Sequence, residues 1–186
     1  MSLTAKATEL NKMIAEGSFT NSQGDGLAQE EAIRTLISLL TELRANKGCV
    51  FLLGNGGSAA VVSHILTDYV NIADLNARTL HESSLLTCIS NDYGYENSFS
   101  LPLSKMAQKQ DILIAVSSSG NSKNIRNAAT VMSQIGGTVI TLTGFKRDNP
   151  LRSMGDINFW FDSDQYGLVE IGHLFLLHHL SDCLKQ

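Results

Sequence analysis

The chain has 186 residues, of which 43% are hydrophobic and 17% are charged, and its formal net charge is −4 at pH 7. This length and composition fit one globular domain and exclude a disordered chain. The negative charge argues against a broad nucleic-acid-binding surface, and no apolar run is long enough to span a bilayer.

Cysteine usage and the N-terminal residues indicate a compartment. Cys49, Cys88 and Cys183 are widely spaced and form no Cys-x-x-Cys pair, and the first residues lack a signal-peptide pattern. We therefore expect a cytoplasmic protein with reduced thiols, whose partners include neither nucleic acid nor membrane.

The hydrophobic pattern predicts helices that alternate with strands. Two helices are expected first, at 3–16 and 28–46, separated by a polar break at 17–26. The predicted strands are 49–53, 84–89, 112–116, 138–143 and 157–161. The other predicted helices are 57–71, 98–107, 121–135 and 168–184.

Apolar strands flanked by helices are typical of a parallel sheet covered on both faces. We therefore expect a three-layer α/β sandwich in a single domain, 1–186, with N-terminal helices in 1–46 and the α/β core in 47–186. Because these helices precede the first strand, we expect them to pack in an oligomer instead of on the sheet.

Two turns rich in glycine and serine each follow a predicted strand and open a predicted helix. They are Gly54-Asn55-Gly56-Gly57-Ser58 and Ser117-Ser118-Ser119-Gly120-Asn121-Ser122. Unpaired backbone N–H groups and the positive end of the helix dipole favour an anion at such a turn. A single turn also occurs in ordinary βα loops, but two together, with four serines in the second, indicate a phosphorylated small molecule. The first turn does not match G-x-G-x-x-G, which disfavours a nicotinamide cofactor.

These segments resemble the sugar isomerase (SIS) domain family, most specifically in 116–124 (VSSSGNSKN) and 136–144 (GGTVITLTG). Within that family the chain is most similar to the phosphoheptose isomerases, through the first turn, SNDYGYE at 90–96, and the histidine-bearing last helix. The resemblance covers residue 28 to the end. It implies a flavodoxin-like sheet and a homotetramer with active sites at subunit interfaces. It also implies interconversion of sedoheptulose 7-phosphate and D-glycero-D-manno-heptose 7-phosphate in bacterial heptose and surface-polysaccharide synthesis.

The resemblance also assigns the substrate-binding residues. It implies that Ser117, Ser119 and Ser122 bind phosphate with help from the first turn, and that Asp92 contacts the sugar. We expect Asn91 and Asp92 to follow the third strand, at the sheet edge where ligands of open α/β sheets bind. The full set that we assign to the sugar phosphate is Asn55, Gly56, Gly57, Ser58, Asp92, Ser117, Ser118, Ser119 and Ser122.

Aldose–ketose isomerisation through an enediol requires a base, a conjugate acid and an electrophile at the oxygens, a role that a metal can fill. His64 and Asp68 are four residues apart, so they share a helix face. Glu170 and His178 are eight residues apart on the last helix, about 80° around its axis. Two imidazoles and two carboxylates suit a divalent metal such as Zn²⁺. We assign Asp68, Glu170 and His178 to catalysis and all four residues to the metal, one ion per subunit.

The resemblance supports the same four positions but reveals two departures. Asp68 replaces a glutamate that the family uses as catalytic acid/base, and Glu170 replaces a glutamine. Because aspartate is one methylene shorter, Glu170 is an alternative base, and a related sugar phosphate is an alternative substrate. His173, one turn from Glu170, is expected to support the site or pack, and His81 is expected to be solvated.

Other functions remain open. The chain also resembles the DnaA initiator-associating protein, a tetramer that works by protein contact, but the two histidines and two carboxylates disfavour a non-catalytic role. A sugar-phosphate sensor usually carries a DNA-binding module, for which this chain has no room. A hexulose-phosphate isomerase would share the serine turn, but not the histidine pattern of the last helix.

Overall fold

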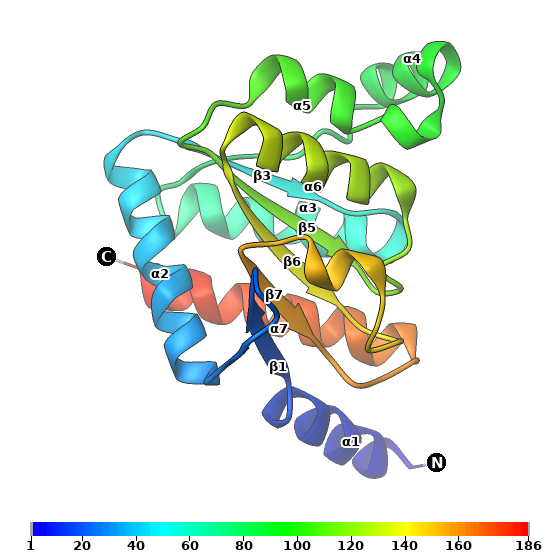
Figure 1. Ribbon diagram of the computed structural model, residues 1–186. Coiled ribbons are helices and arrows are strands. Elements are labelled where there is room, and N and C mark those ends of the chain that lie inside the picture. Colours follow the sequence, from blue (N-terminus) through cyan, green and yellow to red (C-terminus); the bar gives the residue numbers. More distant parts are fainter. Residues whose placement is uncertain (1, 186) are drawn as a thin grey trace.

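The computed structural model describes residues 2–185 and places a seven-stranded sheet between layers of helices (Figure 1). The strands are β1 (Ser18–Asn21), β2 (Gly26–Leu27), β3 (Cys49–Leu53), β4 (Asn76–Arg78), β5 (Ile112–Ser117), β6 (Thr138–Thr143) and β7 (Ile157–Trp160). Their order in the sheet is β2-β1-β7-β6-β5-β3-β4. The five strands from β3 to β7 pair in parallel, in the spatial order β4-β3-β5-β6-β7. Counted along the chain, this is the order 2-1-3-4-5. This is the strand order of flavodoxin-like folds, as the resemblance implies.

Helices cover both faces of the sheet, which confirms the predicted three-layer arrangement. They are α1 (Leu3–Ala15), α2 (Gln29–Ala45), α3 (Gly56–Asn71), α4 (Ser83–Tyr93), α5 (Ser100–Met106), α6 (Lys123–Ile135) and α7 (Tyr166–Leu184), with 3₁₀ helices η1 (Tyr95–Asn97) and η2 (Pro150–Ser153). Alternate strand residues face opposite layers. In β3, Val50 and Leu52 join the core that contains α2, α3 and α7, whereas Phe51 joins the core of α5 and α6. No helix within the described residues is both long and apolar enough to cross a membrane.

The prediction of a strand at 84–89 is wrong, because this apolar run belongs to α4. Glu82 caps that helix by accepting hydrogen bonds from the N–H groups of Ser84 (3.0 Å) and Leu85 (2.8 Å). The strand of this unit is β4, which lies at the sheet edge and has no buried residue. A short apolar run does not by itself distinguish a strand from a helix, and an edge strand needs no apolar run.

The expected polar break at 17–26 contains a β-hairpin instead. β1 pairs antiparallel with both β2 and β7, and Phe19 packs on Phe159 with ring centroids 4.2 Å apart. For α2, the expectation that the N-terminal helices pack away from the sheet is also wrong. One face of α2 is buried in the chain's own core, through Ala32, Leu36, Leu40 and Leu43.

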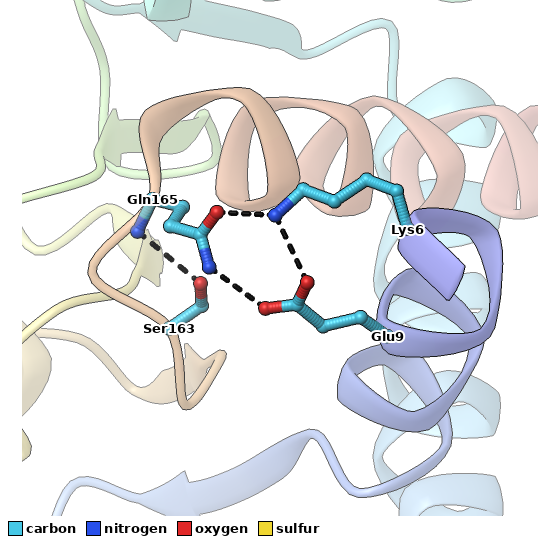
Figure 2. Close-up of polar contacts among 4 residues, drawn as sticks. All are labelled: Lys6, Glu9, Ser163 and Gln165. Atoms are coloured by element: carbon cyan, nitrogen blue, oxygen red, sulfur yellow. Dashed lines mark hydrogen bonds and ion pairs between the residues drawn. The ribbon is translucent and has the colours of Figure 1, made fainter. Parts of the chain in front are cut away.

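A polar cluster joins α1 to the beginning of α7 (Figure 2). The ammonium of Lys6 donates to Glu9 (2.9 Å) and to the side-chain oxygen of Gln165, whose amide nitrogen donates to Glu9 (2.7 Å). Gln165 is the N-cap residue of α7, and its backbone N–H donates to the hydroxyl of Ser163 (3.2 Å). The hydrogen bond from Lys6 lowers the pKa of Glu9. Because these groups are solvated, their main effect is to orient the first turn of α7.

We predict that Asp111→Ala lowers the free energy of unfolding by about 2–4 kcal/mol, because two backbone N–H groups, one of them buried, lose their acceptor. The carboxylate of Asp111 is buried and accepts from the N–H of Cys49 and of Gln108, each at 2.8 Å. Urea denaturation followed by circular dichroism measures the change. Asp182→Ala, at an exposed position, is the control. Equal stability of the Asp111 variant and the wild type would contradict this role.

Candidate functional site

The two turns rich in glycine and serine lie side by side at the carboxyl ends of β3 and β5. These strands are neighbours, and the helices that follow them, α3 and α6, pack on opposite faces of the sheet. Ligands of open α/β sheets bind at such a switch point. A cavity of about 240 Å³ opens here, lined by Asn55, Gly56, Gly57, Ser58, Ser117, Ser118, Ser119, Ser122, Tyr166 and Glu170. The structure thus brings together every residue that we assigned from the two turns, and it adds Tyr166.

A reciprocal amide pair connects the two turns. The side-chain nitrogen of Asn55 donates to the oxygen of Asn124 (2.8 Å), and that of Asn124 donates to the oxygen of Asn55 (3.0 Å). The hydroxyl of Tyr95 donates to the same oxygen of Asn55 (2.8 Å). Asn124 is buried in the first turn of α6 and also donates to Ser98 (3.2 Å). The orientation of Asn55 therefore depends on two residues that we did not single out from the sequence.

The serine turn has the backbone shape and the free donors that an anion requires. Gly120 has φ +63°, and a Cβ there would lie 1.8 Å from the side-chain oxygen of Asn149, so only glycine fits. The hydroxyl of Ser118 is buried and has no hydrogen-bond partner within residues 2–185. The N-cap Ser122 makes no side-chain bond to its helix. The N-terminus of α6 is therefore open to a phosphate group.

Glu170 places a carboxylate against the N-terminus of α3. A Cβ at Gly57 would lie 2.1 Å from a carboxylate oxygen of Glu170, so the absence of a side chain at Gly57 permits this approach. The positive end of the α3 dipole favours a negative charge at this position. Glu170 lines the same cavity as the four serines, and it is the one of our three catalytic candidates that does so.

The other catalytic candidates meet where α3 packs against α7. His178 Nδ1 and Asp68 Oδ2 are 2.8 Å apart, and both side chains are partly exposed. The ring of His64 packs edge-on against His178, with centroids 5.1 Å apart. A carboxylate bonded to an imidazole can orient the ring and stabilise its protonated form. Glu170 is separate from this group, because it precedes His178 by eight residues, about 12 Å along the helix.

The four predicted metal ligands do not converge on one point. Within residues 2–185, no group of three or more His, Cys, Asp or Glu side chains is arranged to hold a metal ion. His178 is bonded directly to Asp68, and Glu170 is in contact with Gly57 two turns away. A tetrahedral zinc site needs its donors around a single centre. The donor types suit zinc, but their arrangement does not fit it.

Asp92 lies outside the cavity, on the exposed surface of α4. Its carboxylate accepts a hydrogen bond from the side chain of Asn91 (2.8 Å). The prediction that these two residues follow a strand is wrong, because the segment before them is helical. His81, which we expected to be solvated, is partly buried. Its ring packs on Phe99, with centroids 5.5 Å apart, and burial lowers its pKa.

Comparison with known proteins identifies the family of the chain. Residues 25–144 match the model of the SIS domain. The chain is 30% identical over 163 residues to the phosphoheptose isomerase of Helicobacter pylori, covering 84% of each chain. It is 37% identical over 143 residues to that of Sulfurimonas denitrificans, covering 73% of this chain and 72% of the relative. The chain belongs to the SIS domain family. Among solved structures, phosphoheptose isomerase GmhA from Neisseria gonorrhoeae aligns with a TM-score of 0.83 at 27% identity, over 98% of this chain and 96% of that one.

His173 is a core residue of this SIS domain. It is fully buried, its Nε2 lies 3.1 Å from the carbonyl oxygen of Thr143, and its ring stacks on Phe161 with centroids 5.6 Å apart. Burial lowers its pKa to about 4, although the hydrogen bond to Thr143 opposes the shift. The ring is therefore neutral at pH 7, and it packs in the core and does not line the cavity.

We predict that the protein loses stability as the pH falls from about 6.5 to about 4. In this window the unfolded chain binds a proton at His173 and the folded chain does not, so acid favours unfolding. The loss from this group is on the order of 3 kcal/mol. Urea denaturation across the window, for the wild type and His173→Gln, isolates the contribution. Identical pH dependence in the two proteins would refute it.

Proposed function

We propose that the chain is a phosphosugar isomerase that interconverts sedoheptulose 7-phosphate and D-glycero-D-manno-heptose 7-phosphate. The observation that carries the proposal is the cavity in which a serine turn and a carboxylate lie together at the switch point of the sheet. Relatives named phosphoheptose isomerase, at 30% and 37% identity, support the choice of substrate. We place the activity in the cytoplasm, which the three free cysteines support.

We assign the phosphate of the substrate to the second turn. Ser117, Ser118, Ser119 and Ser122 surround the open N-terminus of α6 and supply neutral donors. The first turn, from Asn55 to Ser58, offers backbone and side-chain donors to the sugar hydroxyls. Asp92 lies on α4 and does not line the cavity, so only the resemblance supports it as a sugar contact.

We assign proton transfer between C1 and C2 to the carboxylates and the histidine. In such a reaction a base removes the proton from one carbon, and its conjugate acid returns a proton to the neighbour through an enediol. With phosphate on C7, the reacting carbons lie at the far end of the sugar from the serine turn. Asp68, toward the end of α3, meets His178, which lies eight residues beyond Glu170 on α7, and this distance from the turn supports the two as the acid–base pair. Glu170, beside the turn, is the alternative base.

Zinc stays a prediction from the resemblance. The four residues His64, Asp68, Glu170 and His178 do not fit a shared ion as they are placed, so no step is assigned to a metal. If zinc is required, a chelator abolishes turnover, and His64→Ala abolishes both bound metal and turnover.

We predict that Asp68→Asn and His178→Gln each lower kcat by about 100-fold or more, because general acid–base catalysis contributes that much. The substrate is sedoheptulose 7-phosphate, and NMR follows the aldose product with added zinc and then with chelator. Asp68→Glu, which restores the family's glutamate, is the matched control and should remain active. If kcat is unchanged in Asp68→Asn but falls in Glu170→Gln, the base is Glu170 and not Asp68.

An inactive wild-type protein would oppose the proposal. Absence of turnover with and without zinc would favour a related sugar phosphate or the non-catalytic alternative, a tetrameric protein that binds the DnaA initiator. A direct binding measurement against that initiator would separate these two explanations.

We also propose that the chain assembles as a homotetramer. Large apolar side chains are exposed on α3 and α7, at Val70 (51%), Ile171 (51%) and Phe175 (56%). Exposed apolar groups of this size on neighbouring helices favour burial against another subunit. Light scattering at micromolar concentration is expected to give four times the chain mass of 20.2 kDa. We expect Phe175→Glu to give smaller species, and a monomeric wild type would contradict the assembly.

A further inference from the structure

A second polar cavity, of about 400 Å³, lies between the β1–β2 hairpin and the segment that connects β6 to β7. It is lined by Ser18, Thr20, Asn21, Gly24, Gly26, Arg147, Asp148, Asn149, Arg152 and Ser153. It shares no lining residue with the cavity of the two Gly/Ser turns. The isomerase proposed above makes no use of it.

Two guanidinium groups meet in this cavity, and Trp160 positions them. The Cζ atom of Arg152 lies 4.7 Å from the centroid of the indole ring, and that of Arg147 lies 6.0 Å from it. Arg152 also donates hydrogen bonds to the carbonyl oxygen of Arg147 (2.8 Å) and to the hydroxyl of Ser18 (3.1 Å). The guanidinium of Arg152 is therefore fixed at the cavity wall before any ligand arrives.

These positive charges have no counter-charge in direct contact. Asp148 lines the same cavity, yet across residues 2–185 neither Arg147 nor Arg152 forms an ion pair with a carboxylate. Burial lowers the pKa of Arg152, and the charge of Arg147 lowers it further. Two like charges held close together without a partner favour an anion between them. This concentration of positive charge occurs in a chain whose net charge is −4.

We propose that this cavity binds the phosphate group of a small molecule, as an anion site separate from the serine turn. Guanidinium groups match phosphate oxygens with paired, charge-assisted hydrogen bonds. The hydroxyls of Ser18 and Thr20 line the same wall and add neutral donors. The shared chemistry is a phosphate monoester or free phosphate, and the two sources are separated by titrating each.

The site carries its own reporter, because Trp160 is the one tryptophan of the chain. Fluorescence is titrated with inorganic phosphate and, separately, with sedoheptulose 7-phosphate, against sodium chloride at equal ionic strength. We expect a saturable change with at least one phosphate compound and none with chloride. Arg147→Gln, which leaves Arg152 on the indole, should weaken the apparent affinity about tenfold or more. Arg34→Gln, at an exposed position on α2, removes the same charge elsewhere and should leave the affinity unchanged.

Equilibrium dialysis with radiolabelled phosphate, in a Ser119→Ala background that weakens the serine turn, detects binding that does not alter fluorescence. The site is supported if the Ser119→Ala protein retains phosphate and loses it when Arg147→Gln and Arg152→Gln are added to that background. No response to either phosphate compound together with no retention, or retention that survives these changes, overturns it. A response to inorganic phosphate assigns the site to the free ion, and a response to the sugar phosphate alone assigns it to a phosphorylated sugar. Failure of the isomerase proposal would appear in the turnover assay and would leave these titrations unchanged.

Discussion

The parallel pairing of β3 with β5 is the constraint on which the site depends. It places the carboxyl ends of the two strands next to each other, in a register that pairs Leu53 with Ala115. The helices that follow must leave toward opposite faces, so their N-termini diverge from a common opening. Each N-terminus brings unpaired N–H groups to that opening, and the Asn55–Asn124 amide pair holds one turn against the other. A phosphate site built this way needs little charge from side chains.

The last helix, α7, runs from this opening to the contact between His178 and Asp68. α7 begins at a cap that α1 holds in place, and its first turns bring Tyr166 and Glu170 to the cavity. Farther along, His173 is buried against the carboxyl end of β6, and His178 meets Asp68 on α3. α7 thus sets the spacing between the serine turn and His178, which we propose as the phosphate-binding and acid–base parts of the site. A helix gives a more constant spacing than a loop, which suits a reaction at a fixed distance from an anchoring phosphate.

The parts of the fold that the sequence predicts are those in which local pattern and burial agree. The strands at 49–53 and 138–143 are predicted with their observed bounds, because central parallel strands are buried on both faces and appear as continuous apolar runs. The edge strand β4 carries polar residues and has no apolar run. The apolar run at 84–89 therefore predicts a strand where the structure has α4. The hairpin at β1 depends on the contact of Phe19 with Phe159, a pairing between distant parts of the chain that no local pattern contains.

The same distinction applies to the site. Both turns were found because Gly and Ser after a strand are a local signal, whereas Asn124, Tyr95 and Tyr166 act through contacts formed only on folding. The divergence of the four metal candidates is also a tertiary property. Residue type and helical spacing can place His64 with Asp68, but they do not determine whether Glu170 reaches them.

The structure gives a physical reason for each of the two carboxylates that depart from the family pattern, Glu170 and Asp68. With no side chain at that residue, Glu170 reaches the N-terminus of α3, where the dipole stabilises its charge. A glutamine, which the family resemblance expects at this position, would be neutral there. Asp68, one methylene shorter than the expected glutamate, is nevertheless long enough to bond His178 at 2.8 Å. The chain thus holds one carboxylate beside the serine turn and one against the imidazole of His178, on two helices that pack together. Segment 144–153 lies behind the serine turn, where Asn149 contacts Gly120, and it also carries both arginines of the second cavity. Any ligand of the arginine cavity would therefore contact a segment that supports the serine turn. The two proposed anion sites are connected by this one stretch of backbone.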